Sequence, residues 1–212
     1  MKKLICLALA LCMLCLFAGC KKEQPKDDTS STISKNSDIE KIAEGGKFEG
    51  AEYGIGASYD EVKSYYKKLY DDYMNIHTAP GAGEGHEGEG SADGAHDHEE
   101  LPYFDISETD DYVEIETANF RFYVDAKDEN KGVVAIATDG DVFGFTANVT
   151  TQYEVEEKVG SDNKTLNATD KELAFVAYAQ ENTLVLRYEY ENNILDFYFC
   201  ENTLQTTVIR IK

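Results

Sequence analysis

The sequence predicts an α+β protein built from two tandem units, each a helix packed on a three- to four-stranded antiparallel meander sheet. Three observations lead to this prediction. In each half, a capping signal precedes apolar residues at helical spacing. Segments of alternating apolar and polar residues follow each helix, and short polar turns separate them. Because strands joined by short turns pair antiparallel, each half is expected to form a meander.

Residues 1–19 have the pattern of a secretory signal peptide. Lys2 and Lys3 precede an apolar run over 4–18, which is shorter than the ~20 residues that the alternative, a membrane-spanning helix, needs. Leu16-Phe17-Ala18-Gly19-Cys20 resembles the lipobox of bacterial lipoproteins, with Phe17 where that family usually has Leu. The resemblance implies cleavage before Cys20 and attachment of diacylglycerol and an acyl chain such as palmitate to its thiol. The protein is therefore expected on the extracytoplasmic face of a cell membrane or outer membrane, held there by lipid.

Residues 20–46 carry the expected lipidated cysteine and are predicted to be a flexible tether, because they are polar and lack an apolar period. The first unit is expected over 47–139. It begins with a capping box at Ser58-Tyr59-Asp60-Glu61. The helix that follows carries apolar residues at helical spacing, namely Val62, Tyr66, Leu69 and Tyr73.

Residues 80–100 form an insert in this first unit that is rich in glycine, acids and histidine and is expected to be disordered. Imidazole and carboxylate groups close together suit Zn²⁺, Ni²⁺ or Cu²⁺. The hypothetical metal ligands are His77, His86, His96, Asp97, His98 and Glu99. The alternative is an acidic loop whose histidines have no role.

The strands of the first unit are expected at 112–116, 120–124 and 132–137, and residues 138–141 form a turn that predicts the boundary between the units. The second unit is expected over 140–212. Its helix begins at the capping pair Thr151 and Glu154 and ends at Gly160. An extended segment at 142–145 precedes this helix, and strands at 173–179, 184–190, 194–199 and 204–211 follow it.

The helix boundaries carry a second resemblance. The segment from Gly56 to Val62 and the pair Val159-Gly160 are similar to the opening and closing steps of helices in tandem domains of the β-lactamase-inhibitor-like and outer-membrane-assembly-lipoprotein kind. The first helix lacks the closing glycine and the second lacks the opening one. The resemblance implies a non-enzymatic module that binds another protein with an open sheet face.

Composition narrows the function further. The formal net charge of −21 argues against nucleic acid as a partner. Of five cysteines, four lie within the first 20 residues, and Cys200 is expected to be a buried, inert thiol. No nucleophile elbow, phosphate loop or zinc-protease motif is present, so the protein is predicted not to be an enzyme.

The sequence therefore favours a lipid-anchored binding module that recognises another envelope or secreted protein. Tyr198 shares a strand face with Asp196 and is predicted to be a surface residue that contacts this partner. The alternative function is capture of a divalent metal, such as zinc, by the His- and acid-rich insert.

Overall fold

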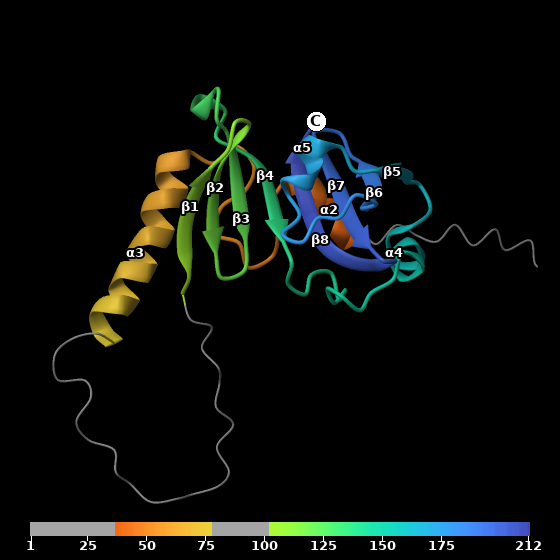
Figure 1. Ribbon diagram of the computed structural model, residues 1–212, viewed down its shortest axis with the longest axis horizontal. Helices are drawn as coiled ribbons and strands as arrows, with labels where there is room; N and C mark the ends of the chain where they lie inside the picture. Colours follow the sequence, from red (N-terminus) through yellow and green to blue (C-terminus); the bar gives the residue numbers. More distant parts are fainter. Residues whose placement is uncertain (1–36, 78–101) are drawn as a thin grey trace, which may run out of the picture. The chain divides into compact units, whose positions relative to one another are not determined.

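The computed structural model describes residues 37–77 and 102–212, which belong to one compact unit. Cys20 and the insert lie outside these residues. Eight strands form one antiparallel sheet in the order β1-β2-β3-β4-β8-β7-β6-β5 (Figure 1). The α+β class is confirmed. The prediction of two separate sheets is wrong, because the strands of the two halves join edge to edge.

Each half contributes a four-stranded meander. The first contains β1 Phe104–Glu108, β2 Tyr112–Thr117, β3 Arg121–Asp125 and β4 Val133–Thr138. The second contains β5 Lys164–Asn167, β6 Leu184–Glu189, β7 Asn193–Cys200 and β8 Thr203–Ile211. Strands β4 and β8 join the meanders, with Ile136 opposite Ile209. Every residue of β4 is buried, so its backbone groups need a neighbouring strand on both sides, and β8 supplies the second one.

Four helices accompany the sheet in the described ranges, together with the 3-10 turn η1 Glu129–Lys131. They are α2 Ser37–Gly45, α3 Tyr59–His77, α4 Gln152–Val159 and α5 Asp170–Leu173. Helix α2 falls inside the segment predicted to be tether, but its Ile39 and Ala43 are buried. The folded part therefore begins by Ser37 and not at 47. Within 37–77 and 102–212, no helix is both long and apolar enough to cross a bilayer.

The two faces of the sheet are covered by different elements. On one face, buried residues of α2, α3 and α4 (Ala43, Val62 and Val155) pack with Phe122, Leu195 and Ile209 of the sheet. The opposite face is covered by α5 and the residues after it, so that α2 and α5 lie on opposite sides of the second meander (Figure 1). The main apolar sheet residues on this face are Tyr123, Tyr198 and Val208.

Two predicted segments differ from the structure. The strand expected at 173–179 is absent, because α5 ends at Leu173 and the chain then turns. Phe175 and Val176 of this irregular segment are both buried against the sheet. In α3, Val62 is fully buried, but Leu69 is 45% exposed. The C-terminal end of this helix runs on past the sheet (Figure 1).

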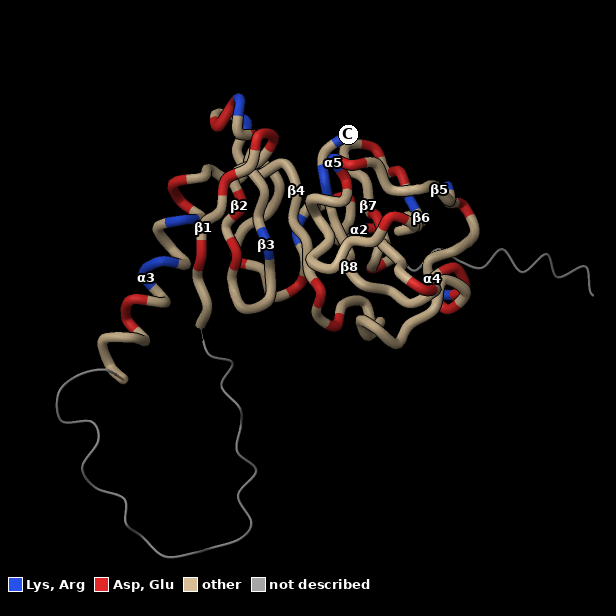
Figure 2. Tube along the Cα trace, viewed as in Figure 1, with Lys and Arg blue, Asp and Glu red and all other residues tan. Residues whose placement is uncertain are grey.

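The acidic side chains show no single concentration. Figure 2 shows Asp and Glu distributed over the helices, the strands and the turns of the described chain. A distribution of this kind keeps a protein soluble and repels anions, and it does not by itself define a binding site.

Candidate binding pocket

A pocket of about 370 Å³ lies between α2, α4 and the turn that follows β4. Its size is at the lower end of the range for small-ligand pockets in proteins, roughly 300–1,000 Å³, and so suits a single side chain or a small molecule. Four apolar residues line it, Ile39, Ile42, Val142 and Phe143. Four charged residues complete the lining, Asp38, Glu49, Asp141 and Lys158.

One wall is a tight turn at Val142–Phe145. The backbone N–H of each of these two residues donates to the carbonyl oxygen of the other, at 3.1 and 2.9 Å. The central residues, Phe143 and Gly144, have φ angles of 58° and 71°, as the tightest hairpin turns require. The extended segment predicted at 142–145 is therefore wrong. Positive φ in a bulky residue such as Phe143 is uncommon and must be held by its surroundings.

Aromatic packing and a lysine hold this turn. The ring of Phe143 lies 5.9 Å from that of Phe48 and 6.4 Å from that of Phe197. The ammonium of Lys158 donates to the Phe143 carbonyl oxygen and lies 5.1 Å from the centre of the Phe145 ring. Lys158, the one cation among the described lining residues, is therefore engaged with the wall.

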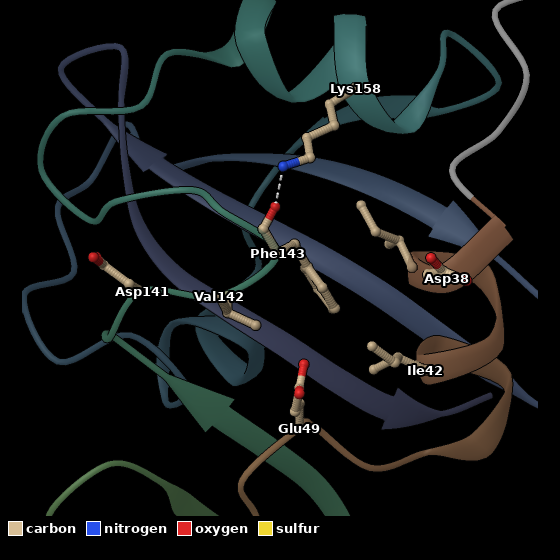
Figure 3. A pocket seen from close by; sticks show the side chains of 8 residues that line it. Asp38, Ile42, Glu49, Asp141, Val142, Phe143 and Lys158 are labelled. Carbon is tan, nitrogen blue, oxygen red and sulfur yellow. Dashed lines mark hydrogen bonds between the residues drawn. The ribbon is translucent and has the colours of Figure 1, made fainter.

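Figure 3 shows how the lining side chains lie. Ile42 of α2 and the Phe143 ring point toward one another, and the Glu49 carboxylate points into the space between them. Asp141 lies at the outer edge and turns away from the centre. Neither Glu49 nor Asp141 has an ion-pair partner among the described residues. The pocket thus combines an apolar floor with one inward carboxylate.

The lining combines apolar and charged side chains. None of the eight residues carries a hydroxyl, thiol or imidazole that could act as nucleophile or acid–base group at neutral pH. Within the described ranges, no group of three or more His, Cys, Asp or Glu residues is placed to hold a metal ion. A cationic group with an apolar stem matches what the pocket offers.

A second polar cluster lies on the opposite sheet face and has a structural role. Asp196 is fully buried and accepts hydrogen bonds at 2.8 Å from Arg187 and from Arg210. Both arginines also pair with Glu172 of α5. Burial tends to lower the pKa of Arg187, but its hydrogen bonds to these two carboxylates raise it above the ordinary arginine value. The cluster ties α5 to the sheet.

Arg121, the third arginine of the chain, also contacts the segment that begins with α5. Arg121 of β3 donates to the carbonyl oxygen of Phe175 at 3.1 Å and to Asp139 at 2.7 Å. All three arginines of the sequence therefore hold the α5 segment on this face. The α5 segment therefore covers this face over the second meander, whereas the same face of β1 and β2 carries no helix in Figure 1.

The residues predicted to form sites are not brought together. Tyr198 is completely buried and its hydroxyl donates to Asp196 at 3.5 Å, so the prediction that it is a surface residue is wrong. His77 is exposed at the end of α3, where its ring stacks on Tyr73 at 4.0 Å. The other predicted ligands and the lipid attachment site lie outside the described residues, namely Cys20, His86, His96, Asp97, His98 and Glu99. Cys200 is buried, as predicted.

The pocket residues were not identified in the sequence. One local pattern in the sequence points to this region. The pair Phe143-Gly144 stands between two apolar residues, and its glycine favours a tight turn. Glu49 gives no signal of its own, since the chain has 41 acidic residues.

Comparisons with known proteins leave the family open. No protein-family model matches the chain, and no curated protein matches it. One solved structure is similar, the crystal structure of YjgB, a DUF4309 family protein from Bacillus subtilis. The two chains are 13% identical, with a TM-score of 0.33 over 71% of this chain and 97% of the other. A TM-score of this size does not establish a common fold.

Proposed function

We propose that this protein is a non-catalytic binding module of the bacterial cell envelope, anchored through lipid on Cys20 and recognising another envelope or secreted protein. The observation that carries this proposal is the pocket with an apolar floor and the inward carboxylate of Glu49. Its lining pairs apolar side chains with charged ones, a combination that suits binding of a side chain with an apolar stem and a charged end. The lipobox-like segment supports the proposed location, because acyl chains on Cys20 would hold the protein at a membrane surface.

Site-specific photo-crosslinking in the full lipid-anchored chain tests this function. A photoreactive amino acid replaces Val142 at the pocket wall or, as control, exposed Glu181. We expect one crosslinked envelope protein from position 142 that is lost when Glu49→Gln is added, and none from position 181. Equal adducts at both positions, or no adduct from position 142, would contradict the proposal.

Metal capture by the insert is the second function that the sequence suggests. Its remaining ligands lie outside the described residues, and His77, the described member, has its Nδ1 atom 3.0 Å from the Tyr73 carbonyl oxygen. No observation in the described part of the chain favours this function over protein binding.

A further inference from the structure

We infer that the pocket beside α2 takes the side chain of a lysine or arginine from a basic segment of the partner protein. This inference rests on the proposed function and names the chemistry that the same site recognises. It follows from the apolar floor, the orientation of Glu49, the engagement of Lys158 and the net charge of the chain.

The floor selects a ligand with an aliphatic stem. Ile39 is 3% exposed and belongs to the main core, and Ile42, Val142 and Phe143 pack against that core. These residues are therefore held in place before a ligand arrives, so little ordering cost opposes binding. Long basic side chains bury their methylene stems on surfaces of this kind while the charged end stays at a polar edge.

Glu49 selects the charge at the end of that stem. Its carboxylate points into the pocket (Figure 3), and no described residue forms an ion pair with it. A ligand ammonium or guanidinium would form a charge-assisted hydrogen bond there. An anionic ligand would face Glu49 together with Asp141 of the lining, so like-charge repulsion disfavours it.

Lys158 does not neutralise this carboxylate. Its ammonium donates to the Phe143 carbonyl oxygen, on the side of the pocket opposite Glu49 in Figure 3. Gly144 allows this contact, because a Cβ at that position would lie 2.8 Å from the lysine nitrogen. The lysine therefore braces the turn and leaves Glu49 available to a ligand.

The negative net charge of the protein favours association with a basic segment of a partner over a neutral or acidic segment. The formal net charge of −21 attracts cations over distances limited by the Debye length, about 8 Å at physiological ionic strength. A pocket of about 370 Å³ accepts one side chain. Neighbouring basic residues of the partner then add long-range attraction without needing pockets of their own.

Peptide titration of the full chain in detergent micelles tests the inference. The probes are three acetylated pentapeptides with central Lys, norleucine or Glu between glycine and serine residues, and binding is followed by nuclear magnetic resonance of methyl groups of Ile39, Ile42 and Val142. We expect the Lys peptide to bind at least tenfold more tightly than the norleucine peptide, and the Glu peptide not to shift these signals. Higher salt should weaken binding of the Lys peptide only.

Matched variants localise the effect. Glu49→Gln should lower the affinity for the Lys peptide at least fivefold, Asp141→Asn by a smaller factor because this carboxylate turns outward, and exposed Glu181→Gln not at all. Equal affinity for the Lys and norleucine peptides, or equal loss in Glu49→Gln and Glu181→Gln, would overturn the inference. If the Lys peptide binds as expected but position 142 crosslinks no protein in cells, the proposed function fails while the ligand chemistry stands. If position 142 crosslinks a partner but the Lys and norleucine peptides bind equally well, the inferred ligand chemistry fails while the proposed function stands.

Discussion

The side-chain amide of Asn193 on β7 donates to the carbonyl oxygen of Ala43 at 3.0 Å and so caps the end of helix α2. The same amide donates to the Glu44 carbonyl oxygen at 2.9 Å. Carbonyl groups at a helix C-terminus have no partner within the helix, and Asn193 is only 5% exposed. This contact therefore fixes to the sheet the helix that supplies Asp38, Ile39 and Ile42 to the pocket.

Replacement of Asn193 by Ala should destabilise the protein. The variant removes the side-chain donor of two carbonyl groups of α2, of which the Ala43 oxygen also accepts from the Gly46 N–H. We therefore expect a loss near the lower end of the about 1–3 kcal/mol that an unsatisfied buried group costs. Urea unfolding followed by circular dichroism measures the change. Asn192→Ala, an exposed neighbour in the same turn, is the control and should change stability little. Equal unfolding midpoints for the two variants would show that the cap contributes nothing.

The hydroxyl groups of two buried tyrosines should have opposite effects. The Tyr123 hydroxyl is buried near Glu114 without a well-formed hydrogen bond to any described residue, whereas the Tyr198 hydroxyl donates to Asp196. Tyr123→Phe removes an unsatisfied buried group and should stabilise the protein by about 1 kcal/mol. Tyr198→Phe removes a donor to a buried carboxylate and should destabilise it. Thermal unfolding of both variants checks the sign, and a destabilised Tyr123→Phe would show that this hydroxyl has a partner.

The parts of the fold that could be predicted are those with local patterns. Strands β2, β3, β4, β6, β7 and β8 are predicted because each is an alternating or continuous apolar segment between polar turns. Strand β5 contains one apolar residue, Leu166, and so shows no period. In α2, Ile39, Ile42 and Ala43 lie at helical spacing, which indicates a short helical turn but not the full helix. Pairing of β4 with β8 joins segments far apart in the chain, and no local pattern encodes it.

The pocket and the burial of Tyr198 depend on such distant contacts. Ile42, Val142 and Lys158 come from three separate segments that only the folded sheet brings together. Tyr198 was predicted to be exposed because Asp196 on the same face is charged. The register places Arg187 opposite Asp196, with Arg210 also in hydrogen-bond contact, and these two arginines allow the carboxylate to be buried. Local alternation does not reveal such partners.

Glu172 should make stability depend on pH. Burial tends to raise the pKa of this carboxyl, but hydrogen bonds from the Thr169 backbone and from Arg187 outweigh it and hold the pKa below its usual value of 4.5. A carboxyl with a lowered pKa in the folded state contributes stability above the pKa of the unfolded chain, and that contribution is lost as pH falls. The difference in unfolding free energy between the native protein and Glu172→Gln should therefore be constant near pH 7 and shrink below about pH 4.5.

Urea unfolding at several pH values measures this difference. Exposed Glu181→Gln is the control, and its difference from the native protein should not change with pH in the same window. If the Glu172→Gln difference is the same at pH 3 and pH 7, the ion pairs of Glu172 with the two arginines do not stabilise the fold.

Gly144 should be intolerant of a side chain. Its φ of 71° lies in the left-handed region, which costs an L-residue about 1–2 kcal/mol. Gly144→Ala should lower the free energy of unfolding by that amount and weaken peptide binding, because the new Cβ would also displace the Lys158 ammonium. Gly45→Ala is the control, since that glycine has open space around its Cβ position. A stable Gly144→Ala variant with unchanged peptide affinity would show that the turn does not shape the pocket.

Replacement of Cys20 by Ser should abolish lipid attachment. The lipobox-like sequence Leu16-Phe17-Ala18-Gly19 precedes this cysteine directly, and the thiol is the group that the resemblance implies is acylated. Two or more acyl chains are needed for stable anchoring, since each buried CH₂ contributes only ~0.8 kcal/mol. Metabolic labelling with an alkyne fatty acid should mark the native protein in the membrane fraction and leave the Cys20→Ser variant unlabelled. Cys15→Ser, inside the apolar run, is the control and should keep the label, whereas a labelled Cys20→Ser protein would place the lipid on another residue.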